Sequence, residues 1–235
     1  MNTRMGLAAA LAASALLLAG CAGAGEPAPP ASTVDPPVAS DYELEAAWLD
    51  DGRLFAVVTW GSSSCVPVAD SVEAEGQTVT VTFAEEAADR VCTADYSPRA
   101  TLVGLPEGVD ASEDVEIVLH DPLIEGVAAQ TSLDGNAALA GAGPTDYAPS
   151  AGWFDDRGLV LLTWGSSSCP PIIEDLVESD GAATVTFATE EGACTRDMAP
   201  RLTLIGFADD HDEDDFVLTL DGAEFDGVQV RPIGS

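Results

Sequence analysis

Two copies of one short segment carry the side chains best suited to chemistry. The chain reads Trp-Gly-Ser-Ser-Ser-Cys at residues 60–65 and again at residues 164–169. A serine nucleophile needs a general base beside it, and neither copy brings a histidine or a lysine. The segment also lacks the second glycine of a nucleophile elbow. We therefore expect no serine-hydrolase site here.

A small set of polar residues recurs in both copies. The pairs are Ser62/Ser166, Ser63/Ser167, Ser64/Ser168, Thr93/Thr195, Asp95/Asp197 and Arg99/Arg201. Serine side chains hydrogen-bond nearby backbone and favour tight turns after a strand. Asp95 either pairs with Arg99, four residues later, or caps the turn that contains it. Both readings give the set a structural role rather than a catalytic one.

The two histidines do not recur. We align His120 of the first copy with Leu220 of the second, and His211 lies in an acidic loop. An enzyme would need a polar cluster that only one copy holds, such as His120 with neighbouring acids. We therefore expect a protein that is not an enzyme.

Four residues are candidates for binding. They are Trp60, Trp164, Arg99 and Arg201. Each tryptophan ends an apolar run just before a cysteine, where an indole commonly packs in the core of a β-sandwich. An exposed aromatic platform for a ligand is the alternative.

The cysteine count indicates two disulfides. Five cysteines are present, and four of them fall in the repeated region. Of the three pairings that four cysteines allow, only Cys65–Cys92 with Cys169–Cys194 gives each copy the same bridge. Neither copy has the close cysteine spacing of a redox motif or the histidines of a zinc site, so we expect no cofactor.

Residues 209–215 concentrate acidic side chains and invite a test for calcium. Asp210, Asp212 and Asp214 alternate as calcium ligands can. The loop lacks the turn-forming glycine and the distal glutamate of a calcium-binding loop. These three aspartates remain candidates, but we expect a solvated loop and no specific metal site.

An internal duplication sets the domain organisation. Ordered matches continue from Asp41-Tyr42, repeated at residues 146–147, to Gly104, repeated at Gly206. Recurrence at a nearly fixed offset is the signature of homologous modules. We predict a first module at residues 40–135, a linker at 136–144 and a second module at 145–235.

Each module has the pattern of an all-β fold. Val79, Val81 and Phe83 alternate with threonines, which is the period of a half-buried strand. The runs at 54–60 and 159–164 are more uniformly apolar and are predicted as central strands. We predict two small antiparallel sandwiches or barrel-like modules of about six strands, each with one internal disulfide. Whether they pack together stays open.

The charge balance excludes one class of partner. The chain has 41 acidic and eight basic residues, a formal net charge of −33. Binding to a nucleic-acid backbone depends on clustered lysine and arginine, so we expect no nucleic-acid partner. The hydrophobic content of 46% is that of a folded protein, and the charge is typical of a solubility feature.

The N-terminus resembles the signal of a bacterial lipoprotein. Arg4 precedes an Ala/Leu-rich run that ends in Leu18-Ala19-Gly20-Cys21, which is similar to a lipobox. The resemblance implies a signal peptide at 1–20, lipidation of Cys21 and a location at the outer face of the cell membrane. Residues 21–39 are rich in Pro, Ala and Gly, as expected of a tether.

Both repeated blocks resemble those of uncharacterised lipoproteins of high-GC Gram-positive bacteria. These blocks read Trp-Gly-Ser-Ser-Ser-Cys-x-Pro and Cys-Thr-x-Asp-x-x-Pro-Arg. The resemblance implies a location and supplies no mechanism. We expect a membrane-anchored, non-enzymatic binding protein with an envelope protein or a glycan as its partner. The alternatives are an envelope hydrolase or its accessory, and a cation-binding or structural envelope component. The oligomeric state stays open.

Overall fold

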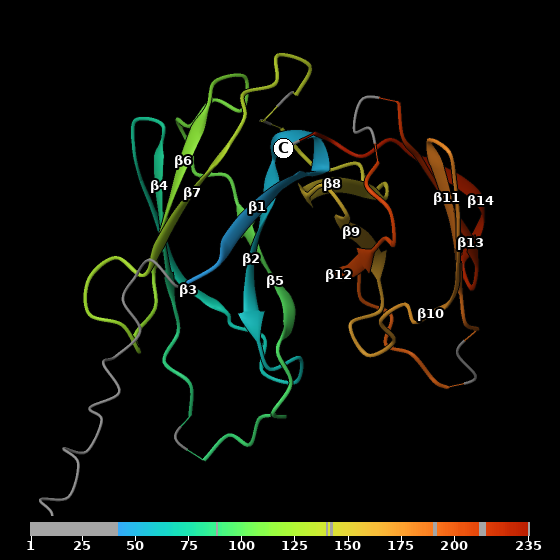
Figure 1. Ribbon diagram of the computed structural model, residues 1–235, viewed down its shortest axis with the longest axis horizontal. Helices are drawn as coiled ribbons and strands as arrows, with labels where there is room; N and C mark the ends of the chain where they lie inside the picture. The colour runs from blue at the N-terminus through green and yellow to red at the C-terminus, as the bar shows by residue number, and fades with distance from the viewer. Residues whose placement is uncertain are drawn as a thin grey trace, which may run out of the picture. The chain divides into compact units, whose positions relative to one another are not determined.

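The computed structural model is all-β and consists of two similar halves (Figure 1). It describes residues 42–87, 89–139, 141, 143–189, 192–211 and 215–234. The predicted signal peptide, Cys21, the tether, Asp212 and Asp214 lie outside these residues. In the described part of the chain, no helix has the length and apolar character needed to cross a membrane.

Each half contains a three-stranded and a four-stranded sheet. In the first half the order is β1 (Leu44–Leu49), β2 (Leu54–Gly61), β5 (Ser97–Gly104) in one sheet; the other is β3 (Ala69–Glu75), β4 (Thr78–Phe83), β6 (Val115–His120), β7 (Ala129–Leu133). In the second half β8 (Ser150–Asp155), β9 (Gly158–Gly165) and β12 (Ala199–Gly206) form the smaller sheet. The larger one comprises β10 (Ile173–Ser179), β11 (Ala182–Phe187), β13 (Val217–Gly222) and β14 (Phe225–Val230). The described residues thus hold seven strands per half, one more than expected.

The all-β prediction and the bridge in each half are confirmed, with one difference in strand direction. Most neighbouring strands are antiparallel, but β4 pairs in parallel with β6, and β11 with β13. The reason is that β5 and β12 lie in the opposite sheet. The chain crosses over to them after β4 or β11 and returns in its original direction, as parallel pairing requires.

Three apolar clusters hold the fold together. Each half has one cluster between its two sheets: the first surrounds the fully buried Trp48, and the second surrounds the fully buried Trp153. The third lies between the two halves, where Leu49 and Val58 of the first meet Phe154 of the second. β2 and β9 are therefore buried on both faces, which confirms their prediction as central strands.

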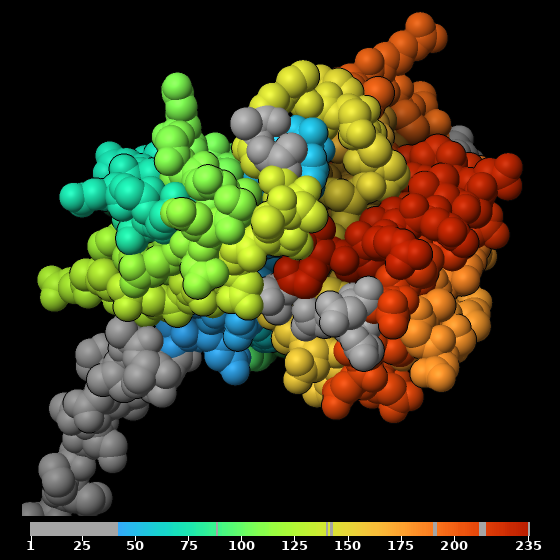
Figure 2. Space-filling view, turned by 90° about the horizontal axis from the view of Figure 1, so that it is seen from above, coloured from blue at the N-terminus to red at the C-terminus, as the bar shows by residue number. Residues whose placement is uncertain are grey.

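The two halves pack together through equivalent elements of one compact unit, residues 36–235. β1 contacts β8, and β5 contacts β12. Gly152 allows the close approach, because a Cβ there would lie 2.2 Å from the carbonyl oxygen of Trp48. The C-terminal segment, red in Figure 2, also connects the two halves. The Ile233 carbonyl accepts a hydrogen bond from the Trp153 N–H at 3.0 Å, and the Ile233 side chain packs on the core of the first half.

Candidate functional site

The repeated Ser-Thr-Asp set forms a hydrogen-bonded cluster beside each disulfide. In the first half the Ser62 and Thr93 hydroxyls lie 2.8 Å apart, and the Thr93 N–H donates to Ser64 Oγ at 3.0 Å. Thr93 also donates to Asp95, which accepts from the Ser63 N–H as well. The cluster joins the two loops that Cys65–Cys92 links, so its residues serve the fold.

The second half repeats this cluster almost contact for contact. The Ser166 and Thr195 hydroxyls lie 2.7 Å apart, and the Ser167 N–H donates to Asp197 at 3.3 Å. Hydrogen bonds from Ser167 and Thr195 lower the pKa of Asp197 to about 2. Bonds from Thr93 and Ser63 likewise lower the pKa of Asp95. A carboxylate held ionised in this way anchors donors and is a poor base near neutral pH.

The two cystine bridges connect the predicted partners. Cys65 pairs with Cys92 and Cys169 with Cys194, with Cα–Cα distances of 5.6 and 5.7 Å. Among the described residues, the one group of potential metal ligands close enough to share an ion is Cys65, Cys92 and Glu86. Its two sulfurs are bonded to each other and are therefore not thiolate ligands.

Both candidate arginines tie strand ends to the disulfide loops. Arg99 donates to the Cys65 carbonyl at 2.8 Å and to the Trp60 carbonyl at 3.3 Å. Arg201 donates to the Cys169 and Trp164 carbonyls at 3.1 and 3.2 Å. No ion pair joins Asp95 to Arg99 among the described residues, where Asp95 instead fastens the turn.

The glycine after each tryptophan has a physical reason. A Cβ on Gly61 would lie 2.7 Å from Cζ of Arg99, and one on Gly165 would lie 2.8 Å from Cζ of Arg201. Each guanidinium group therefore lies against bare backbone. This contact explains why Trp-Gly and Pro-Arg recur together in the sequence.

The candidate tryptophans border the interface between the halves. The Trp60 ring lies 6.3 Å from that of Phe154, and the Trp164 ring lies 5.1 Å from that of Tyr147. Both indoles pack against the cluster that joins the halves. Trp60 and Trp164 are thus partly buried packing residues, which disfavours an open aromatic platform.

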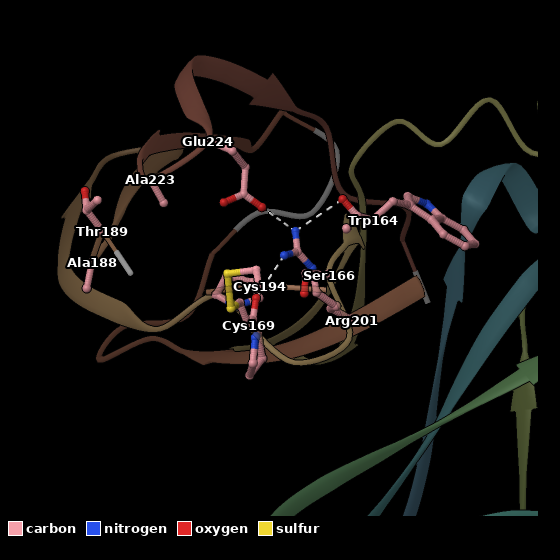
Figure 3. A pocket seen from close by; sticks show the side chains of 12 residues that line it. Trp164, Ser166, Cys169, Ala188, Thr189, Cys194, Arg201, Ala223 and Glu224 are labelled. Carbon is pink, nitrogen blue, oxygen red and sulfur yellow. Dashed lines mark hydrogen bonds and ion pairs between the residues drawn. A yellow bond between two sulfur atoms is a disulfide. The ribbon is translucent and has the colours of Figure 1, made fainter. Parts of the chain in front are cut away.

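A pocket of about 440 Å³ opens beside the disulfide of the second half (Figure 3). Its walls include the Cys169–Cys194 bridge, Pro171 and Ala188, and its charged groups are Arg201 and Glu224. Figure 3 shows the Glu224 carboxylate pointing at the Arg201 guanidinium, with which it forms an ion pair. The Trp164 indole points out of the pocket, which it lines through its backbone.

Burial makes the arginine of this pocket a fixed positive group. The Arg201 side chain is 7% exposed, whereas that of Glu224 is 48% exposed. Among the described lining residues, no histidine, lysine or tyrosine accompanies them. The arrangement suits recognition of a ligand with an apolar body and a polar end. Sequence reasoning named Arg201 but missed Glu224, which has no equivalent in the repeated blocks.

Neither histidine lines this pocket. His120 ends β6, and its expected equivalence with Leu220 is wrong. Leu119 pairs with Val81, and Leu220 pairs with the equivalent Val185. The next residues, His120 and Asp221, are therefore the ones that match. A shift of one residue would turn every buried side chain of the strand outward.

His211 lies in a second, acidic pocket of about 340 Å³. Its ring packs 4.7 Å from that of Phe216, and its Nε2 lies 3.4 Å from Oε2 of Glu178. Asp210, a calcium candidate, lines the pocket and forms an ion pair with Arg157 at 3.5 Å. Asp212 and Asp214 lie outside the described residues, so the calcium hypothesis stays a prediction.

Comparisons with protein families, curated proteins and solved structures found no match.

Proposed function

We propose that the protein is a membrane-anchored extracytoplasmic lipoprotein that binds a ligand of the cell envelope and is not an enzyme. The lipobox-like sequence at Leu18–Cys21 supports the anchor. The two disulfides support an exported protein, because such bridges persist in oxidising compartments.

One observation carries the binding role: the open pocket beside Cys169–Cys194 holds a buried arginine paired with a carboxylate. A pocket with apolar walls and few convergent polar groups is the usual form of a ligand site. Its serine, Ser166, is already held by Thr195 and Ser168, and no base accompanies it among the described lining residues. The pocket therefore favours binding over catalysis.

Fractionation of the producing cells tests the anchor. We expect the wild-type protein in the membrane fraction and Cys21→Ser in the soluble extracytoplasmic fraction. Ala22→Ser keeps the thiol and serves as the matched control. Equal membrane retention of Cys21→Ser and the wild type would overturn the anchor.

A pocket-filling variant tests the binding role. Ala188 lines the pocket, and Ala188→Phe places a ring in it. Ala84 holds the equivalent place in the first half, so Ala84→Phe is the control: its N–H donates to Val68 as that of Ala188 donates to Ile172, just past the ends of the paired strands. We expect Ala188→Phe alone to lose retention on cell-wall fractions. Retention equal to that of the wild type would contradict a role for this pocket.

A hydrolase is a second candidate because His211 lies beside Glu178 in the acidic pocket. A histidine and a carboxylate are common acid–base partners. Release of reducing ends from purified cell-wall glycan by the wild type, lost in His211→Gln but not in His120→Gln, would establish it. If the wild type releases no reducing ends, the hydrolase candidate is excluded and the binding role remains.

A further inference from the structure

In the first half, a tyrosine of the chain itself fills the space beside the repeated arginine. The Tyr42 hydroxyl donates to Asp121 Oδ2 at 3.0 Å, with Thr59 beside it. Thr59 in turn accepts from Arg99 at 3.4 Å. Burial, then the neighbouring Asp121, raises the pKa of Tyr42. The phenol thus joins a group of four polar side chains: Asp121, Tyr42, Thr59 and Arg99.

In the second half, the equivalent tyrosine lies elsewhere. Tyr147 is 53% exposed and its ring packs on Trp164, whose indole points away from the pocket. Its backbone N–H donates to Thr145 Oγ1, which itself donates to Asp50 of the first half. The connection between the halves therefore holds this tyrosine away from the position that Tyr42 occupies.

A proline explains why the strand stops short of that position. Leu44 pairs with Thr59 in the first half, and Pro149 replaces it in the second. Proline has no N–H to extend the ladder, and β8 begins only at Ser150. The place opposite Thr163 is left without a β8 partner.

The side chains around this place lack the contacts that their counterparts make. Thr163 is fully buried, and among the described residues its hydroxyl has no hydrogen-bond partner. It pairs directly with Arg201 across β9 and β12, so both side chains lie on the pocket side of the sheet. Buried hydroxyl groups normally have a hydrogen-bond partner, so the unpaired hydroxyl of Thr163 indicates that a partner is missing.

Glu224 of the second half offers a carboxylate to which a partner of Thr163 could also bind. The tight turn between β13 and β14 brings Glu224 to Arg201, where the longer connection of the first half brings Asp121 to Tyr42. Glu224 pairs with Arg201 through Oε1, and its other oxygen is able to accept a further hydrogen bond.

We propose that this pocket binds a phenol, an aromatic ring with a hydroxyl group, in the position that Tyr42 occupies in the first half. The ring lies between the disulfide and Ala223, and its hydroxyl donates to Glu224 and accepts from Thr163. The proposal rests on the proposed binding function and specifies the ligand class. Either a tyrosine side chain of a partner polypeptide or a free small phenol supplies this chemistry.

Titration of the full chain with three probes tests the proposal. The probes are N-acetyl-tyrosinamide, N-acetyl-phenylalaninamide and p-cresol, followed by amide shifts in the protein NMR spectrum. We expect the tyrosine probe to bind about tenfold or more tightly than the phenylalanine probe, because only the former has a hydroxyl to pair with Glu224 and with the buried Thr163. Shifts are expected at Ala188 and Thr189, which line the pocket.

The third probe separates the two sources. Tighter binding of the tyrosine probe than of p-cresol indicates a polypeptide partner, and the reverse order indicates a free phenol. Equal affinity for the tyrosine and phenylalanine probes, no binding of either at millimolar concentration, or shifts confined to other surfaces would each overturn the proposal.

Two variants locate the hydroxyl group. Glu224→Ala is expected to reduce affinity for the tyrosine probe to that for the phenylalanine probe. Asp226→Ala removes the same charge from β14 outside the pocket and is expected to change nothing. If the phenols fail to bind while Ala188→Phe still abolishes retention on the cell wall, the ligand class is wrong and the binding function stands.

Discussion

Thr163 lies directly across the β9–β12 pair from Arg201, and no described residue hydrogen-bonds its hydroxyl. Its counterpart Thr59, across from Arg99, accepts a hydrogen bond from that arginine and lies beside the Tyr42 hydroxyl. The two halves thus share a buried threonine opposite an arginine but satisfy its hydroxyl differently. This difference, rather than the conspicuous repeat, marks the candidate site.

The two threonines are expected to respond oppositely to the same substitution. Thr59→Val removes the hydroxyl that accepts a hydrogen bond from Arg99 and should lower the free energy of unfolding by about 0.5–1.5 kcal/mol. Thr163→Val removes an unsatisfied buried hydroxyl and should leave stability unchanged or raise it. Urea denaturation of both variants measures this, and equal losses would show that Thr163 has a partner after all.

The arginine–glycine contact predicts a steric effect. Gly165→Ala places a Cβ against the Arg201 guanidinium and should destabilise the protein by about 1–3 kcal/mol through forced displacement. Gly206→Ala is the control, because a Cβ there meets no atom within 4 Å. A melting temperature for Gly165→Ala that matches the control would contradict the contact.

The hydrogen-bonded aspartates predict a loss of stability in acid. Because the pKa of Asp197 lies below its usual 3.8, at about 2 in the folded protein, its ionised form stabilises the fold above that range. The contribution is lost as the pH falls from about 4 towards 2. Denaturation midpoints at pH 7 and pH 2.5 should differ less in Asp197→Asn than in the wild type. An Asp226→Asn variant, which changes a residue away from the cluster, should keep the wild-type difference between the two midpoints.

The bridges predict a thiol count and a stability loss. Alkylation of the unfolded, unreduced protein should leave the four bridge cysteines unmodified, and reduction should expose all four. Replacing Cys169 and Cys194 with alanine should cost about 3 kcal/mol, because each bridge closes a loop of 25 to 27 residues. Four free thiols before reduction would rule out the bridges.

Much of the fold was predictable because duplication doubles the information in the sequence. It selected one cysteine pairing out of three, and the alternation around Val81 identified a half-buried strand. The parallel pairing of β4 with β6 was not predictable, since periodicity reports which face is buried and not the direction of a neighbouring strand.

The candidate site was less accessible to sequence reasoning. A search for shared polar residues finds Asp95 and Arg99, which both halves use for structure. The pocket arises where the copies differ, at Pro149 in place of Leu44 and at the shorter turn before Glu224. These two differences are visible in the sequence. They indicate a pocket only once the structure shows where Tyr42 lies in the first half.

The packing of β1 on β8 and of β5 on β12 brings like surfaces together. Contact between identical patches is the geometry of a two-fold symmetric dimer. A single unduplicated module with this apolar face would therefore pair with a second copy of itself, and both copies would carry the same tyrosine arrangement. Two copies joined in one chain are free of that constraint, and here they differ: Tyr42 bonds Asp121 within the first half, whereas Tyr147 packs on Trp164 in the second.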